Sequence, residues 1–253
     1  MSFTERFTSR AAVYALARPS YPAAAIDALI AGLGDPASLV VADLGAGTGL
    51  SSRAIAARGP RVLAVEPNAA MRENALRDER VGWIAGTAEA TTLADASVDA
   101  VAAFQAWHWV DQDAAVAEAR RILRPGGRLA AVYNEHDLDD RFTAAYASIF
   151  SRFSTRDVEG RRAHGLDGFT AIAPAHVRRS AFANPFVLDR EGAHAHARSQ
   201  SFLPQAGAAA DDMHAFIDEL VTAYQRDGRV TLQFVTVVAA LPVAALAPQG
   251  EPG

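Results

Sequence analysis

A glycine-rich stretch behind a carboxylate is the first group of residues in this chain that could do chemistry. It reads Asp43-Leu44-Gly45-Ala46-Gly47-Thr48-Gly49, follows a β-rich run at 39–44, and a helix is expected to begin near Leu50. Glycines in such a turn let a ligand approach the backbone and permit positive φ values. An ordinary turn between a strand and a helix could contain the same glycines. A carboxylate at the ligand-binding end of the strand, however, suits a ligand with an ammonium group.

A second acid stands at the end of the next predicted strand. The segment Val65-Glu66-Pro67-Asn68 places Glu66 17 residues beyond Gly49. A carboxylate at this point can accept hydrogen bonds from both hydroxyls of a ribose. Asp43 and Glu66 together predict a ligand that has a ribose and an amino acid portion.

A third group lies after the fourth predicted strand and contains two of the three tryptophans. It reads Gln105-Ala106-Trp107-His108-Trp109-Val110-Asp111. His108 is the ionisable side chain of this loop with an ordinary pKa near neutrality, so it could accept a proton from a hydroxyl or an amine. It could equally serve only to orient the loop. At least one of Trp107 and Trp109 is expected only to pack under the following helix.

Two further histidines, His194 and His196, are separated by one residue and could be interpreted as a metal pair. No glutamate or third histidine follows at the spacing of metal ligands, so we expect a solvated helix or loop there and assign no metal. The chain has no cysteine, which excludes disulfides, thiolate metal sites and a thiol nucleophile.

The composition argues against several kinds of partner. The 24 basic and 29 acidic residues give a formal charge of -5, so the surface has no basic field to attract nucleic acid. No apolar run approaches the roughly 20 residues of a membrane span, and the first residues lack the apolar core of a signal peptide. We therefore expect a soluble, cytoplasmic protein with neither a membrane nor a nucleic-acid partner. The sequence does not indicate an oligomeric state.

Alternating strands and helices must position these groups. The β-rich runs between residues 38 and 134 are 39–44, 61–66, 81–85, 98–104 and 128–133. Their spacing of about 20 to 30 residues predicts βα units, and hence a parallel sheet with helices on both faces. The runs 98–104 and 129–133 are almost wholly apolar, which is typical of central strands.

Other patterns predict how the sheet is completed. A helix is expected over 113–123, and Arg124-Pro125-Gly126-Gly127 should then form a turn into the next strand. Later β-rich runs at 182–188 and 230–238 flank a helical segment at 211–227 and can complete the sheet. From about residue 137 to 179 the pattern is helical, and its apolar spacing indicates the core of an added helical layer, although a lid that also contacts substrate has the same pattern. The apolar residues are Phe142, Tyr146, Ile149, Phe150 and Phe153.

Several motifs, in order over roughly residues 10 to 135, make the chain resemble the class I S-adenosylmethionine-dependent methyltransferases. Within these it is similar to the small-molecule branch, methyltransferase type 11, with its ubiquinone/menaquinone-type and trans-aconitate-type enzymes. The motifs are Asp43 to Gly49, Val65 to Asn68 with Met71, Gly86-Thr87-Ala88-Glu89, Phe104 to Trp109, and Leu123 to Gly127. The segment Tyr14-Ala15-Leu16-Ala17-Arg18-Pro19-Ser20-Tyr21-Pro22 resembles an N-terminal segment that packs over the cofactor in the same branch.

The resemblance implies S-adenosyl-L-methionine as cofactor, S-adenosyl-L-homocysteine as product, and a role for each matching residue. Asp43 would meet the methionine ammonium, Glu66 would hold the ribose hydroxyls, and Arg18 would bind the methionine carboxylate, although it could equally cap a helix or pair with a surface acid. Pro67 and Met71 would form apolar walls on the adenine. Ala88 would offer its backbone amide to the ring, and Thr87 or Glu89 a polar contact; related enzymes often have aspartate in place of Thr87. The cofactor site would also include Tyr14, Gly45, Ala46, Gly47, Phe104 and Gln105.

The resemblance further implies transfer of a methyl group to an O, N or C atom of a small-molecule acceptor. This in-line displacement needs alignment and exclusion of water, which aromatic walls provide. The acceptor pocket would include Tyr21, Trp107, His108 and Trp109. One alternative is a protein of this fold that binds the cofactor without methylating. An NAD-dependent oxidoreductase fits less well, because Leu50 stands where its fingerprint needs a small residue and Asp43 would repel a pyrophosphate.

We therefore expect an α/β protein with a doubly wound, Rossmann-like, seven-stranded and mostly parallel sheet, helices on both faces and a helical insertion or cap. A single methyltransferase domain is expected over 1–243, followed by a flexible tail at 244–253. The expected parts are an N-terminal helical cap segment at 1–35, the cofactor-binding core at 36–135, a helical insertion near the substrate at 136–180, and a sheet-completing part at 181–243.

Overall fold

The computed structural model describes residues 17–154, 163–200 and 202–246. The chain divides into two compact units. The sheet unit comprises Ser20–Tyr133, Arg162–Phe182 and Val237–Gly253. The helical unit comprises Met1–Pro19, Asn134–Arg161 and Ala183–Thr236.

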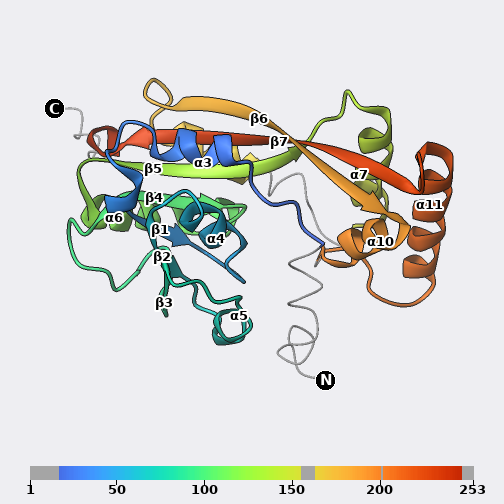
Figure 1. The fold of residues 1–253 in the computed structure, drawn as a ribbon, viewed down its shortest axis with the longest axis horizontal. Helices are drawn as coiled ribbons and strands as arrows, with labels where there is room; N and C mark the ends of the chain where they lie inside the picture. Colours follow the sequence, from blue (N-terminus) through green and yellow to red (C-terminus); the bar gives the residue numbers. More distant parts are fainter. Residues whose placement is uncertain (1–16, 155–162, 201, 247–253) are drawn as a thin grey trace. The chain divides into compact units, whose positions relative to one another are not determined.

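A seven-stranded sheet is the frame of the fold, and its strand order is β3-β2-β1-β4-β5-β7-β6 (Figure 1). The pairs β1–β2, β1–β4, β2–β3 and β4–β5 are all parallel. The mostly parallel, Rossmann-like sheet predicted from the spacing of the β-rich runs is confirmed. Its strands are β1 (Val40–Leu44), β2 (Arg61–Val65), β3 (Val81–Ile84), β4 (Val98–Phe104), β5 (Leu123–His136), β6 (Arg178–Asp189) and β7 (Arg229–Pro242).

Helices connect the strands of the sheet unit. The predicted helix starts at Leu50 and near 113 are confirmed, since α4 begins at Leu50 and α6 at Gln112. The described helices of this unit are α3 (Ala23–Ile30), η1 (Pro36–Ser38), α4 (Leu50–Ala56), α5 (Ala69–Glu73), η2 (Trp107–Trp109), α6 (Gln112–Ile122), η3 (Ala163–Asp167), α9 (Gly168–Ile172) and η4 (Val243–Leu246).

The prediction of a separate turn at 124–127 before the fifth strand is wrong. Strand β5 already begins at Leu123, which pairs with Val98, and the next pair is Ala100 with Arg128. Two steps along β4 therefore match five along β5, so the proline and glycines form an irregularity inside the strand. A side chain at Gly127 would place its Cβ 2.8 Å from the carbonyl oxygen of Asp99, which explains why glycine fits this close approach.

Apolar side chains cover both faces of the sheet unit. Along β1, Val41 lies in one buried cluster while Ala42 and Leu44 lie in the other. The same alternation along β4 assigns Val101 to the cluster of Ala42, because successive strand residues point to opposite faces. Strands buried on both faces explain the nearly continuous apolar runs in the sequence.

The helical unit contains α7 (Arg141–Phe153), α10 (Arg190–Arg198) and α11 (Ala208–Tyr224), together with parts of the three longest strands (Figure 1). Phe142, Tyr146, Ile149 and Phe150 of α7 are buried in a cluster with residues of α10 and α11. The interpretation of this spacing as the core of a helical layer is confirmed. Helix α11 occupies 208–224, three residues earlier than expected at both ends.

The expectation of a solvated segment around His194 and His196 is wrong. Both lie in α10 and are buried, at 9% and 2% exposure. His194 contacts Nδ1 of His214 at 2.8 Å and Asp218 at 3.0 Å, and Nδ1 of His196 lies 3.1 Å from the Tyr146 hydroxyl. Burial strongly lowers the pKa of His196, because an imidazolium without water is costly.

The flexible tail expected at 244–253 is wrong for residues 244–246, and residues 247–253 lie outside the described residues. Residues Val243–Leu246 form a 3₁₀ helix, and Leu246 is buried in the cluster that contains Trp107. Val243 and Ala245 pack against the same cluster, and burial of these apolar side chains stabilises the turn. Within the described part of the chain, no helix is both long and apolar enough to cross a membrane.

Candidate functional site

Asp43, near the carboxyl end of β1, is fully buried. Its Oδ2 accepts hydrogen bonds from the hydroxyls of Ser51 at 2.7 Å and Ser52 at 2.5 Å, both in the first turn of α4. Its Oδ1 is also buried and has no hydrogen-bond partner among the described residues. A buried carboxylate oxygen that lacks a donor favours a ligand that supplies one.

Burial raises the pKa of Asp43 from its ordinary 3.8 to about 6. The two serine hydroxyls oppose this rise because they stabilise the anion, and the nearby charge of Glu66 adds to it. Asp43 is therefore mainly ionised at neutral pH, at a cost in free energy that a cationic ligand would relieve.

The glycine-rich loop between β1 and α4 turns through positive φ values at Gly45, Gly47 and Gly49. The amides of Gly45 and Ala46 donate to the carbonyl of Val65 at 2.9 and 3.2 Å, so the loop is fastened to the end of β2. A Cβ on Gly45 would lie 2.9 Å from that of Ala106, whereas a Cβ on Gly47 would meet nothing within 4 Å. Glycine at 45 thus satisfies internal packing, and glycine at 47 leaves open space beside the backbone.

Glu66 directly follows β2 and is nearly fully buried. Its Oε2 accepts from the amide of Gly47 at 2.9 Å, and its Oε1 accepts from the amide of Asn68 at 2.9 Å. These bonds fix the carboxylate beside the open face of Gly47. Each carboxylate oxygen can accept more than one hydrogen bond, so both can still receive hydroxyl donors. The structure thus brings Asp43, Gly47 and Glu66 together, as predicted from strand ends.

The residues expected beside an adenine follow β2 and β3. Pro67 is exposed, and Met71 is half-buried in the short helix α5. After β3, Ala88 is buried and Thr87 is exposed. The Oε1 of Glu89 accepts from the amide of Asp111 at 2.9 Å, so Glu89 links this segment to the tryptophan loop. The polar contact to adenine stays a prediction for Thr87 and Glu89.

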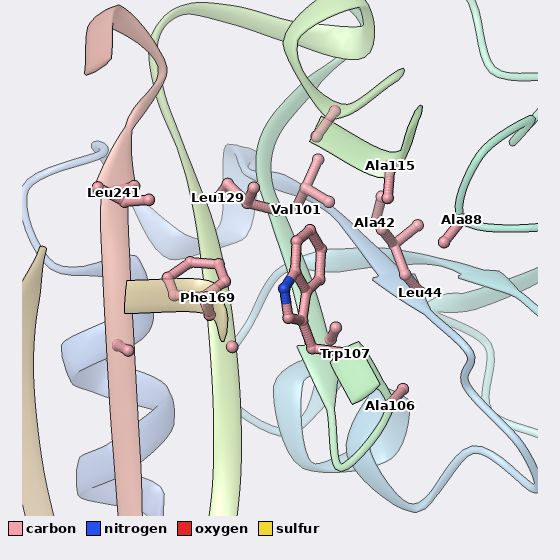
Figure 2. Close-up of a cluster of buried hydrophobic side chains, with 14 of the residues drawn as sticks. Ala42, Leu44, Ala88, Val101, Ala106, Trp107, Ala115, Leu129, Phe169 and Leu241 are labelled. Carbon is pink, nitrogen blue, oxygen red and sulfur yellow. The ribbon is translucent and has the colours of Figure 1, made fainter. Parts of the chain in front are cut away.

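The two tryptophans after β4 have different surroundings. Trp107 lies beside Phe169 in the buried cluster (Figure 2). It is fully buried and meets Phe169 edge-on, with ring centroids 5.3 Å apart. Packing in the core is therefore confirmed for Trp107, and it offers no exposed surface for the wall of an acceptor pocket. Trp109 is 59% exposed. Of the two, Trp109 is the one that can meet an acceptor.

His108 lies between these tryptophans and is half-buried. Its backbone amide donates to the hydroxyl of Tyr133 at 3.2 Å, and its Nδ1 lies 3.0 Å from the same hydroxyl. Its ring centroid is 4.9 Å from that of Trp109. The loop thus holds an imidazole next to an exposed aromatic surface.

Three predicted residues surround the start of this loop. Tyr21 meets Phe104 edge-on at 4.6 Å between centroids, and Phe104 is almost fully buried. Gln105 has a positive φ of 52° although it is not glycine. Strained backbone of this kind is concentrated at functional sites, because the surrounding structure must enforce it.

The two cofactor-binding residues predicted from the N-terminal segment have different outcomes. Tyr14 lies outside the described residues. Arg18 belongs to the helical unit, where its guanidinium donates to the hydroxyl of Ser199 at 3.2 Å and to the carbonyl of Ser199 at 2.9 Å. Its contact with a methionine carboxylate stays a prediction.

Sequence reasoning missed three residues of the site: Ser51, Ser52 and Tyr133. The serines could have been found from their place in the first turn of the helix after the glycine loop. Tyr133 could have been noticed near the end of an apolar β-rich run, but only the folded chain shows that it meets His108. No group of three or more residues that could hold a metal ion occurs in residues 17–154, 163–200 and 202–246.

The chain matches one known family model and is similar to several known proteins. Residues 42–131 match the family model described as a methyltransferase domain. An uncharacterised methyltransferase of Mycobacterium tuberculosis is 46% identical over 133 residues, which are 52% of this chain and 53% of that protein. The chain thus spans about half the length of the mycobacterial relatives that it matches.

Two further similarities cover more of the chain. The malonyl-[acyl-carrier protein] O-methyltransferase of Methylococcus capsulatus is 33% identical over 182 residues, 65% of each protein. A solved structure of a protein assigned as a type II methyltransferase, from Anaeromyxobacter dehalogenans, has a TM-score of 0.65 and 28% identity, and the match covers 89% of this chain and 98% of that one.

Proposed function

Because this chain belongs to the class I S-adenosylmethionine-dependent methyltransferases, we propose that it transfers a methyl group from S-adenosyl-L-methionine to an O, N or C atom of a small-molecule acceptor. The observation that carries the proposal is the buried Oδ1 of Asp43, which has no donor among the described residues. It lies at the strand end where open α/β sheets bind their ligands.

Two carboxylates of the site fit the proposed cofactor. An ammonium group is a donor and a cation, so it satisfies both the open oxygen and the charge of Asp43. Glu66 presents a fixed carboxylate beside Gly47, which suits a pair of ribose hydroxyls. The methionine and ribose portions of the cofactor would be held by Asp43, Gly45, Ala46, Gly47 and Glu66. The adenine would meet Pro67, Met71 and Ala88, with a polar contact from Thr87 or Glu89.

When bound, the cofactor supplies a methyl group on a positively charged sulfur. The chain's own residues bind the two ends of the donor, orient the acceptor and exclude water. The exposed ring of Trp109 offers an apolar wall, and His108 is the group in this loop that could take a proton from an acceptor. These residues serve alignment, which is the main task of the protein in such a transfer.

The experiment measures binding and turnover separately. Calorimetry with S-adenosylhomocysteine should give saturable binding to the wild-type protein, and Asp43→Asn should weaken it. Incubation with S-adenosylmethionine and a panel of phenols, amines and carboxylates should then release S-adenosylhomocysteine. Binding without release on this panel would favour the alternative, a binding module of the same fold. Absence of binding would refute the proposal.

His108→Ala tests the acceptor side. We expect turnover to fall by about tenfold or more, with the dissociation constant for S-adenosylhomocysteine unchanged, because a general base contributes to the reaction but not to cofactor binding. Unchanged turnover would remove His108 from catalysis.

A further inference from the structure

Tyr133 makes two contacts with one histidine that is 25 residues away in the sequence. Its hydroxyl accepts the backbone N–H of His108 at 3.2 Å and lies 3.0 Å from Nδ1 of the same residue. The two rings lie with their centroids 5.9 Å apart. One hydroxyl thus fixes both the backbone and the side chain of His108.

The position of the Tyr133 hydroxyl is itself constrained. Tyr133 is buried in the cluster shown in part in Figure 2, on strand β5. Gly165 packs against its ring so closely that a Cβ there would lie 3.1 Å from the hydroxyl oxygen. Such packing restricts the ring to one orientation, which makes the hydroxyl a fixed reference point for the loop.

The loop around His108 is held at further points. Trp107 fills the core on one side of the histidine. On the other side, the amide of Asp111 donates to Glu89. Asp111 and Glu89 are carboxylates of the two segments that this bond joins, and η3, which packs against the turn, carries Asp167. A loop fixed in this way can present the imidazole with little reorganisation.

The role that Nδ1 takes in this contact, donor or acceptor, decides which nitrogen of the ring can act as a base. The hydroxyl oxygen has two lone pairs and already accepts one N–H. When its second lone pair accepts a hydrogen bond from Nδ1–H, the lone pair of the neutral imidazole is on Nε2. An imidazolium formed by protonation of Nε2 would keep the same bond from Nδ1, so no rearrangement is needed.

We infer that Tyr133 is the positioning residue of His108, and that the pair suits acceptors that lose a proton from oxygen or nitrogen. This inference rests on the proposed function. In the step, the acceptor's O–H or N–H bond breaks and a bond from that atom to the methyl carbon forms. The proton goes to Nε2 of His108, and the electron pair of the broken carbon–sulfur bond stays on sulfur. A carboxylate acceptor has no such proton and needs neither residue.

The first experiment observes the imidazole directly and needs no acceptor. In protein labelled with ¹⁵N-histidine, NMR should show the Nδ1–H form of neutral His108 as the major tautomer. Tyr133→Phe keeps the ring but removes the hydroxyl, so the ratio of Nδ1–H to Nε2–H should fall by about threefold or more. Tyr224→Phe, at an exposed tyrosine of α11, is the matched control and should leave the ratio unchanged. Equal ratios in the wild type and Tyr133→Phe would overturn the inference.

The second experiment separates this inference from the proposed function. On a phenol or amine that the wild type methylates, Tyr133→Phe should lower kcat by about tenfold with KM for S-adenosylmethionine unchanged, and should move the acid limb of the pH profile. Full activity of Tyr133→Phe, or methylation of carboxylates alone, would overturn the inference. If the wild type binds no S-adenosylhomocysteine, the proposed function fails, whereas the tautomer ratio still decides the role of Tyr133.

Discussion

Replacing Asp43 by asparagine should make the cofactor-free protein more stable at neutral pH while it weakens cofactor binding. The wild-type carboxyl has a pKa of about 6 instead of 3.8, chiefly because it is buried. At about 1.4 kcal/mol for each pH unit, the ionised form costs the folded protein about 3 kcal/mol. Asparagine has the same shape and can still accept from Ser51 and Ser52, but it carries no charge.

The sign of the pH dependence follows from the direction of the shift. Because the folded protein binds this proton more tightly than the unfolded chain, the contribution of Asp43 to stability is most favourable below pH 4 and declines until about pH 6. The asparagine variant lacks this decline. Its free energy of unfolding, relative to that of the wild type, should therefore rise by about 1.4 kcal/mol between about pH 5 and about pH 7.5.

Urea unfolding followed by circular dichroism at both pH values measures this difference, and terms that do not depend on pH cancel. Asp212→Asn, at an exposed aspartate of α11, is the matched control and should show no comparable change. In calorimetry, Asp43→Asn should bind S-adenosylhomocysteine about 10- to 100-fold more weakly, the value of a hydrogen bond between charged groups. Parallel pH profiles of the wild type and the variant would refute the reasoning about the buried charge.

Three further predictions concern other residues. Glu66→Gln should weaken S-adenosylhomocysteine binding by about tenfold without unfolding the protein, because it removes the charged acceptor of the ribose hydroxyls; an unchanged dissociation constant in calorimetry would contradict that role. Gly45→Ala and Gly47→Ala share the strain of a positive φ, but only the first meets Ala106, so thermal unfolding should show Gly45→Ala to be less stable by about 1 to 3 kcal/mol. Gly47→Ala should instead lose affinity in calorimetry, and equal melting temperatures would refute the packing argument. His196 has a pKa below its ordinary 6.5, so its contribution to stability is present at higher pH and is lost as the pH falls below about 6.5. In urea unfolding, His196→Gln should therefore lose less stability than the wild type between about pH 7 and pH 5.5. Equal losses would exclude His196 as a source of this pH dependence.

Local patterns in the sequence were sufficient for most of the sheet and for one side of the site. Alternation of β-rich and helical runs predicted the parallel sheet, because strand and helix periodicity depends on neighbours in the chain. Asp43 and Glu66 could be predicted to lie together, since the carboxyl ends of parallel strands meet at one edge. The helix start at Leu50 followed from the glycines before it.

Patterns were insufficient where a distant segment decides the surroundings of a side chain. His194 and His196 have the polar sequence of a solvated helix, but other elements bury them. Trp107 and Trp109 are indistinguishable by type, and only the folded chain assigns the first to a buried cluster, where it meets Phe169. The turn expected at 124–127 became part of β5, because pairing with β4 begins at Leu123.

The sequence by itself therefore determined the residue types at the strand ends, and with them a site for a ligand with an ammonium group and a ribose. Tertiary structure alone decided the state of those residues. It buried Asp43 with one oxygen lacking a donor among the described residues, which raised its pKa, and it brought the hydroxyl of Tyr133 to His108. The physical reason is that burial and hydrogen bonding depend on segments far apart in the chain, which meet only when the sheet has formed.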